Sequence, residues 1–587
     1  MNFSETVSQL LVNTRGTAGA GVLSIACDSS IALFLPEIAL CLTIVLLLVS
    51  RMFTHGRGHD AFLVAFCGAV VALVLASVLA PQFQHRVELF TGMLVYDSFS
   101  VFLRSLLLLF VVLFVVFTRL SGIPDRADGA DIYTLILGAT LGMCLMVSAN
   151  HLLIVFLAVE MASVPSYALA GLMKGRPEAS EAALKYAVYG GATAGVMLYG
   201  ISLLAGLSNS AHLPTIASEL AARLPTMPGD ELMVLVLGSL MIMVGLAFKV
   251  SAVPFHFWCP DVFEGATAEV NAFLSVASKA AALGLLVRVA IGLTTIAPPT
   301  WHAGRAGAGV VDRLPAPQVA AQGYFSVTRA GDNPVGATSG SGGERTPSQA
   351  LAPARDFLGK LVALLAVITC TLGNLAAYGQ TNIKRLLAYS TIAHAGYMLM
   401  AVPPMLVLAE AHPSAARNAV AGLALYLAVY LFLNLGAFAT VAFLRNATGS
   451  EQIADYGGLI RHCPVVVVCL ALMLFGLVGV PPLSGFIGKV AVFASLAEGF
   501  RLMGQGYLLL LLVIGCLNTV LSLFYYLRVV KVMTMDPDPA ARNALALSLG
   551  TPPGMFLFVV TLPTAVLITC WGFLDQLALG AARQLLQ

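Results

Sequence analysis

Long apolar runs separated by short polar breaks make up most of this chain of 587 residues. A membrane-spanning α-helix needs about 20 consecutive, mainly apolar residues. That length, applied along the chain, predicts an all-α polytopic membrane protein with about 14 transmembrane helices. The spans are expected near residues 31–51, 60–80, 97–118, 131–149, 152–173, 181–206, 231–253, 270–296, 357–379, 383–403, 418–444, 463–480, 505–530 and 553–576.

The composition supports a membrane protein and excludes several other classes. Hydrophobic residues make up 59% of the chain and charged residues only 10%, which no soluble domain of this length needs. The net charge of +2 argues against nucleic acid or an acidic surface as a partner. The cysteines are scattered singly, and neither a Walker A sequence nor a glycine-rich dinucleotide motif is present. The chain itself is therefore expected to bind no nucleotide, metal or redox centre.

The basic residues between the spans predict the orientation. Cytoplasmic loops of membrane proteins carry an excess of lysine and arginine. In this chain alternate loops carry most of these residues, so both termini are predicted on the outer face. The basic residues in those loops are Arg51, Arg57, Arg119, Arg126, Lys174, Arg176, Lys384, Arg385, Arg445, Arg461, Lys531 and Arg542.

The predicted spans divide the chain into five segments. A stretch rich in glycine, alanine, proline and serine cannot bury enough apolar surface to fold alone, and it predicts a flexible insertion on the outer face. A small interaction segment is the alternative for that stretch. The segments are N-terminal helices 1–3 (1–130), a first five-helix unit (131–296), the insertion (297–356), a second five-helix unit (357–534) and a C-terminal helix 14 (535–587).

The fourth helix of each five-helix unit is predicted to be discontinuous. Pro254 and Pro260 follow Lys249 in the first unit, and Pro481 and Pro482 interrupt the second. Proline lacks a backbone N–H, and broken backbone at membrane depth survives only when it is buried in protein or lines a wet cavity. Because five is odd, consecutive units must lie inverted in the membrane. Inverted repeats with paired broken helices are typical of ion-transport folds.

One acid and four lysines are predicted at or near membrane depth. They are Glu160, Lys185, Lys249, Lys279 and Lys489. Charged groups are costly in hydrocarbon, so each is a functional-site candidate that faces protein or water. Lys185 has an alternative place at the membrane interface, beside Glu178 and Glu181.

Two histidines are further candidates for moving protons. His256 lies in the first break, and His394 lies in a later span, where a hydrogen-bonded packing role is the alternative. Burial favours the neutral form of a lysine or a glutamic acid, whereas a close opposite charge favours the charged form. A glutamate–lysine pair that opens and closes can therefore gate protons without a bound cofactor.

Five stretches of the sequence together resemble a known family. FKVSAVPFHFWCPDVFEGA, NIKRLLAYSTIAHAGYML, VEMASVPSYALAG, EAALKY and GVPPLSGFIGK are similar to subunit N of NADH–quinone oxidoreductase, respiratory complex I. The resemblance implies 14 helices, with Glu160 paired to Lys249, Lys279 as a central relay and Lys489 on the exit side. Lys185 matches a lysine of the family motif. Glu269 is an unexpected charge in this family, and the insertion is unusual.

The resemblance also implies a function, partners and a location. The chain is expected to translocate protons in a bacterial inner (plasma) membrane, coupled to electron transfer from NADH to quinone on other subunits. NADH, FMN, Fe–S clusters and quinone would bind those subunits, and the partners would be other membrane subunits of complex I and the bilayer. The alternatives are a subunit of a multi-component cation/proton antiporter, a hydrogenase- or ferredoxin-linked relative of complex I, and a structural scaffold.

Overall fold

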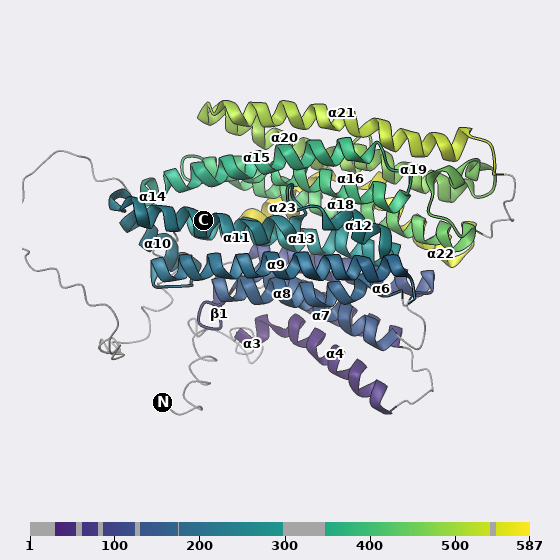
Figure 1. Ribbon diagram of the computed structural model, residues 1–587, viewed down its shortest axis with the longest axis horizontal. Coiled ribbons are helices and arrows are strands. Elements are labelled where there is room, and N and C mark those ends of the chain that lie inside the picture. Colours follow the sequence, from purple (N-terminus) through teal and green to yellow (C-terminus); the bar gives the residue numbers. More distant parts are fainter. Residues whose placement is uncertain are drawn as a thin grey trace, which may run out of the picture.

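Long α-helices lie side by side along the long axis of the molecule in the computed structural model (Figure 1). The structure describes residues 30–53, 61–79, 86–123, 129–173, 175–296, 347–539 and 547–586. Within these ranges, 12 helices are long and apolar enough to cross a membrane, or up to 13 if one bent pair counts as a single span. The prediction of an α-helical membrane protein is therefore confirmed.

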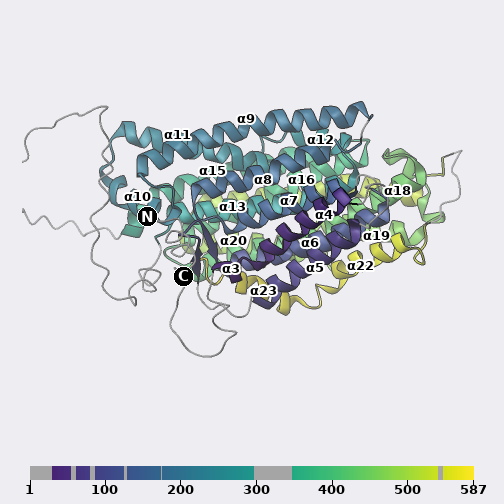
Figure 2. The same cartoon turned by 90° about the horizontal axis from the view of Figure 1, so that it is seen from below.

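The N-terminal part contributes helices and a small β-hairpin. Helices α4, α5 and α6 lie together on the face seen in Figure 2. The hairpin, whose strands pair antiparallel with Val87 opposite Tyr96, is an addition to the predicted helices. The elements are α3 (Ser30–Leu33), α4 (Leu35–Phe53), α5 (Ala61–Leu79), β1 (Val87–Leu89), β2 (Leu94–Tyr96) and α6 (Ser98–Ser121).

The first five-helix unit contains the predicted break. Helix α11 ends at Val250, and α12 begins only at Trp258, so the fourth member is discontinuous. A short helix, α10, precedes it and was not predicted. The elements are α7 (Gly129–Ser148), α8 (Leu152–Ala170), α9 (Pro177–Ser208), α10 (Leu213–Arg223), the 3-10 turn η2 (Leu224–Thr226), α11 (Gly229–Val250), α12 (Trp258–Gly265) and α13 (Ala268–Thr294).

The second unit repeats this organisation. Its fourth member is interrupted between Val478 and Ser484, again as predicted. The first piece, α19, has 15 residues, which is why it falls below the length of a full span. The elements are α14 (Pro347–Ala350), α15 (Ala352–Ala377), α16 (Ile383–Leu399), α17 (Val402–Leu408), α18 (Pro413–Thr448), the 3-10 turns η5 (Ile453–Tyr456) and η6 (Leu459–Arg461), α19 (Pro464–Val478), α20 (Ser484–Met503) and α21 (Gly506–Met535).

The C-terminal helix differs from the single span predicted over 553–576. Helix α22 (Pro552–Val566) and helix α23 (Trp571–Ala582) are separated by a bend of 87°. Pro563 lies inside α22 and supplies no N–H to the helix ladder, which weakens the helix just before the bend. Beyond the bend, α23 packs against α6 and α18.

The predicted insertion is only partly described. Residues 297–346 lie outside the described ranges, whereas 347–356 form α14 and the first turn of α15. The second unit therefore begins about five residues before the predicted boundary, because Pro353 fits the first turn of a helix.

Helices α13 and α18 form the centre of the fold. Nearly every side chain of α13 is buried, and α18 is buried over most of its length. Both helices are mainly apolar on every face, and such a helix belongs inside a protein, so the few charged side chains of α13 are enclosed with it. The two helices pack against each other and join the first five-helix unit to the second.

Candidate functional site

The first break leaves the end of α11 open to side chains from other elements. Ser251 takes the left-handed conformation with φ of 62°, and its N–H donates to the Phe248 carbonyl at 3.0 Å. The last carbonyls of a helix have no partner within the helix, and they carry its partial negative charge. Here two side chains donate hydrogen bonds to these carbonyls. The Trp258 indole donates to Phe248 O at 3.2 Å, and Lys279 Nζ donates to Val250 O at 2.8 Å.

Lys249 lies one residue before that end, in a different environment. It is 2% exposed, and its Nζ has no hydrogen-bond partner among the described residues. Glu160, half-buried on α8, is near enough for the two charges to interact, but the two side chains make no direct ion pair in the described part of the chain. The resemblance implies that Glu160 and Lys249 are paired. In this structure they are neighbours with a gap between them.

Aromatic rings enclose this region. Tyr186 stacks on Trp258 with ring centroids 4.2 Å apart, and Tyr167 meets Tyr186 edge-on at 4.7 Å. Phe248 lies 5.3 Å from Trp258. This packing fixes the first residue of α12 against α9, so the two halves of the broken helix keep a defined relation.

The second break places a lysine in the same way as the first. Gly479 has a φ of 83°, a conformation that glycine adopts without a steric penalty, and it ends α19. Lys489 on α20 is buried, and its Nζ donates to Val478 O, the last carbonyl of α19, at 2.9 Å. The same ammonium lies 4.2 Å from the centre of the Tyr397 ring, a cation–π contact.

A buried polar chain lies beside Lys489. His394 on α16 contacts the Tyr426 hydroxyl through Nδ1 at 2.8 Å and the Tyr526 hydroxyl through Nε2 at 3.3 Å. Tyr526 also contacts Ser390. His394 is thus hydrogen-bonded, as the packing alternative required, and it also belongs to a continuous polar network. The sequence does not predict these tyrosines as part of a site, because a tyrosine in an apolar helix gives no signal of its own.

A second group of paired polar side chains lies next to this network, where the Tyr525 ring packs 4.3 Å from the Tyr526 ring. The Tyr525 hydroxyl donates to Asn374 Oδ1 at 3.1 Å, and Asn374 Nδ2 donates to Asn518 Oδ1 at 3.1 Å. Asn374 also approaches the hydroxyl of Tyr397, the ring beneath Lys489. Polar groups in a low-dielectric interior are kept only when they are paired, and these are paired with one another.

Lys185 and His256 lie at the edge of this arrangement. Lys185 is 35% exposed and forms ion pairs of 2.7 Å with both Glu181 and Asp261. That geometry corresponds to the interfacial alternative, and it ties α9 to α12. His256 is half-buried in the break, and its Nδ1 has no hydrogen-bond partner among the described residues.

Several buried ion pairs were missed. Arg288 on α13 contacts Asp97, the N-cap residue of α6, and Arg104 contacts Glu37 at 3.0 Å; all four side chains are at most 3% exposed. Lys384, assigned to a cytoplasmic loop, is 1% exposed and pairs with Glu451 at 2.8 Å. Glu37, Arg104 and Arg288 each lie inside a predicted span, so the signal that indicates Glu160, a charge within an apolar stretch, is present for them as well.

Glu269, the charge that is unexpected in this family, is buried at the start of α13. It is 1% exposed, and Arg445 on α18 lies 3.6 Å from its Oε1. Asp261 and Glu264 are bound by Arg385 at 3.1 and 2.5 Å, in addition to the contact of Asp261 with Lys185. These charges gather where α12 meets α16, at the end predicted to face the cytoplasm.

Comparisons with known proteins identify the family of this chain. Residues 149–303 and 347–522, together more than half of the chain, match the family model "NADH:quinone oxidoreductase/Mrp antiporter, TM". NADH-quinone oxidoreductase subunit N of Anaeromyxobacter sp. (strain Fw109-5) is 37% identical over 87% of this chain and 88% of that protein. Subunit N 2 of Sorangium cellulosum (strain So ce56) is 36% identical over 93% of this chain and 96% of that protein.

Solved structures share the fold. A chain of respiratory complex I from Thermus thermophilus with bound aureothin has 26% identity and a TM-score of 0.65, covering 92% of this chain and 98% of that one. A chain of the Mrp complex from Dietzia sp. DQ12-45-1b has a TM-score of 0.70 but 16% identity over 97% of this chain and 98% of that one, which supports the fold alone. From the family match and the curated relatives together, the chain belongs to the antiporter-like transmembrane family, as a subunit N of NADH–quinone oxidoreductase.

Proposed function

We propose that protons cross this subunit along Glu160, Lys249, Lys279, His394 and Lys489. The observation that carries the proposal is the matched geometry of Lys279 and Lys489. Each ammonium donates to the last carbonyl of a half-helix at a break in the fold. A carbonyl at a helix end stabilises a cation without neutralising it, so the lysine remains able to give up its proton.

The route has an uptake end and a release end. Glu160 and Lys249 interact across a gap, so a small movement of α8 against α11 would change how strongly each stabilises the charge of the other. Lys279 would take the proton next. The His394 network, which contacts the tyrosines around Lys489, would carry it on. Uptake from the cytoplasm and release to the outside follow the predicted orientation.

Lys185 and His256 have supporting roles in this proposal. Lys185 anchors the short helix α12 through Asp261, which keeps the first break open beside Lys249. His256 lies close enough to Lys279 for their charges to interact, so it is placed to accept a proton from the lysine side of the break.

The work that drives the protons must come from other chains. Moving one charge against 100 mV costs about 2.3 kcal/mol, and nothing in the proposed route supplies it. We assign NADH, FMN, Fe–S clusters and quinone to other subunits, the complex to a bacterial plasma membrane, and both termini of this chain to its outer face. Subunit N relatives at 36–37% identity favour this assignment over a cation/proton antiporter.

The test is a paired substitution of the two matched lysines. Lys279→Met and Lys489→Met remove the proton carrier, whereas Lys279→Arg and Lys489→Arg keep the charge but do not release a proton near neutral pH. We expect all four variants to lose proton uptake in inverted membrane vesicles driven by NADH, at matched amounts of assembled complex. Full pumping in either methionine variant would remove that lysine from the route.

A further inference from the structure

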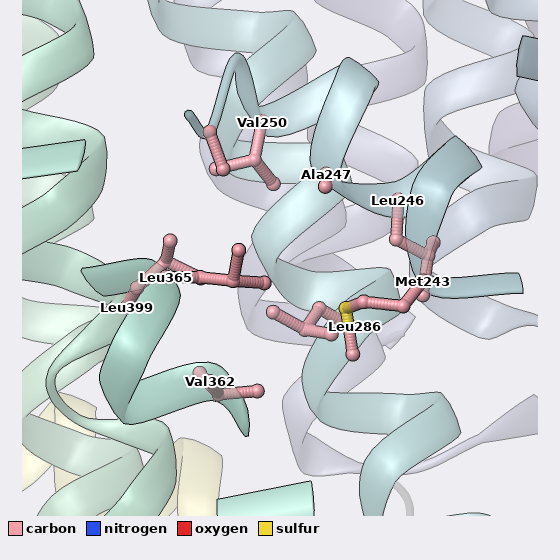
Figure 3. Close-up of a pocket in the computed structure, with 9 residues that line it drawn as sticks. Met243, Leu246, Ala247, Val250, Leu286, Val362, Leu365 and Leu399 are labelled. Atoms are coloured by element: carbon pink, nitrogen blue, oxygen red, sulfur yellow. The ribbon is translucent and has the colours of Figure 1, made fainter. Parts of the chain in front are cut away.

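An apolar cavity lies directly beside the first break. Figure 3 shows residues that line it, from α11, α13, α15 and α16. The space is about the size of a single water molecule, and every lining side chain is apolar. The lining residues are Met243, Leu246, Ala247, Val250, Ala252, Leu286, Val362, Leu365 and Leu399.

The cavity is adjacent to the proposed proton route on one side. Val250 lines it with its side chain, while its carbonyl accepts the hydrogen bond from Lys279. Leu286 lies seven residues after Lys279 on α13, roughly 10 Å further along the helix. Along α13, the lysine is therefore about two helical turns from this lining residue.

A polar cluster lies on the other side. Arg355 is seven residues before Val362 on α15, and its guanidinium donates to Thr294 O at 3.0 Å and contacts Glu410. Thr294 is eight residues after Leu286, roughly 12 Å further along α13. The apolar lining thus separates Lys279 from charged groups at the end of the molecule predicted to face outwards.

A layer of this kind resists hydration. Water stays in a buried site when it finds two to four polar partners, and an apolar cavity of this size stays dry. Hydrophobic constrictions block conduction in channels in the same way, by excluding the water that would carry the charge. A proton leaving Lys279 in this direction would have no acceptor.

We propose that this apolar layer, centred on Leu286 and Val362, is a proton barrier that insulates Lys279 from the outer end of the first unit. The barrier keeps a proton on Lys279 from leaking out through α13 and α15, so that it leaves by way of His394 and Lys489. The inference rests on the proposed function, in that it takes Lys279 as a proton carrier. It adds the residues that prevent protons from leaking from Lys279 to the outer face within the first unit.

The test measures passive leak in the whole complex without turnover. Purified complex I with the Val362→Asn subunit is reconstituted into liposomes, a pH gradient is imposed without NADH, and its collapse is followed with an internal pH dye. We expect collapse to be about tenfold faster than in the unmodified complex, which corresponds to a barrier lowered by about 1.4 kcal/mol. Val362→Thr, which is nearly isosteric, gives a second and milder variant if the asparagine impairs assembly.

The control is an equivalent change outside the layer. Val468 on α19 is 50% exposed and does not line the cavity, so Val468→Asn and Val468→Thr should leave the leak unchanged. Filling the layer with Val362→Ile should keep it closed. An equal leak in the Val468 variants would show that polar substitution in a membrane helix is enough, and it would overturn the barrier.

A double variant separates this inference from the proposed function. In Val362→Asn with Lys279→Met, loss of the leak supports both the barrier and the role of Lys279. A leak that persists shows that its protons do not come from Lys279, and it overturns the proposal that the layer insulates this lysine. Absence of a leak in Val362→Asn, Val362→Thr and Leu286→Asn, all assembled, overturns the barrier. The role of Lys279 is then decided by the pumping of Lys279→Met alone.

Discussion

Lys279 Nζ donates a hydrogen bond to the backbone carbonyl of Val250, at 2.8 Å, and so joins α13 to the open end of α11. The contact has two consequences that can be separated by experiment. It satisfies a carbonyl that the helix cannot satisfy itself, and it holds an ammonium inside the protein at the backbone of Val250, the residue that follows Lys249. If Lys279 only satisfies the carbonyl, its role is structural, and we call this a clasp. If its ammonium also exchanges a proton, Lys279 is part of the proton route.

Hydrogen exchange of the break should distinguish the two roles. Lys279→Met leaves the buried Val250 carbonyl without its donor, at a cost of about 1–3 kcal/mol, so the amides of residues 251–253 and 255–258 should exchange faster. Lys279→Arg retains a donor and should restore most of the protection while pumping stays lost. The measurement is amide exchange by mass spectrometry on the assembled complex. Restored pumping in the arginine variant would make Lys279 a clasp only.

Lys249 should respond differently, because its ammonium has no hydrogen-bond partner among the described residues. Lys249→Ala leaves Glu160 without the nearby positive charge, which favours the protonated acid and blocks the relay. Lys249→Arg keeps the charge but does not release a proton. We expect both variants to assemble and both to lose NADH-driven proton uptake. Measured at matched amounts of complex, full pumping with arginine would show that Lys249 only balances charge.

The elements of the fold could largely be predicted from the sequence, because apolar length is a strong signal. Both discontinuous helices were found from their prolines. The bend between α22 and α23 was not, because Pro563 alone does not specify a turn of 87°, and the direction of α23 is set by its packing on α6 and α18. The β-hairpin was missed because three-residue strands between two spans carry no periodicity that can be recognised.

The site could be predicted residue by residue but not in its contacts. Lone charges in apolar helices identify Lys249, Lys279 and Lys489, since burial of such groups demands a reason. Which carbonyl each lysine meets depends on how α13 and α20 lie against the broken helices. Tertiary packing likewise pairs Lys384 with Glu451, although Lys384 follows a loop and was expected to face the cytoplasm.

The pair formed by Asp97 and Arg288 should matter for stability more than for pumping. Both side chains are at most 3% exposed, and Asp97 also caps α6 by accepting from Ser100 N. Removing one partner of a buried ion pair typically costs about 3–5 kcal/mol. Asp97→Asn keeps an oxygen for the cap, so it should be destabilised less than Asp97→Ala, by about 1 kcal/mol. The readout is the thermal unfolding midpoint in detergent; equal midpoints for wild type and Asp97→Ala would contradict the pairing.

The segment missing from the family match should be dispensable, within limits set by Arg355. The match stops at 303 and resumes at 347. The Arg355 guanidinium connects the residues on the two sides of this gap. It donates to Thr294 O and to Ser348 O, at 3.0 Å each. A short glycine–serine link replacing 304–346 therefore has to join two points that are already close, and shortening a loop changes the closure entropy only slowly.

We expect the variant with this short link to assemble and to retain NADH–quinone activity and pumping. Extending the deletion to 356 removes Arg355 and the first turn of α15, so that variant should fail to assemble. The two deletions are compared by the yield of intact complex and by activity per complex. Failure of the shorter deletion would show that 304–346 is a structural interface, and success of the longer one would show that Arg355 does not anchor this end of the fold.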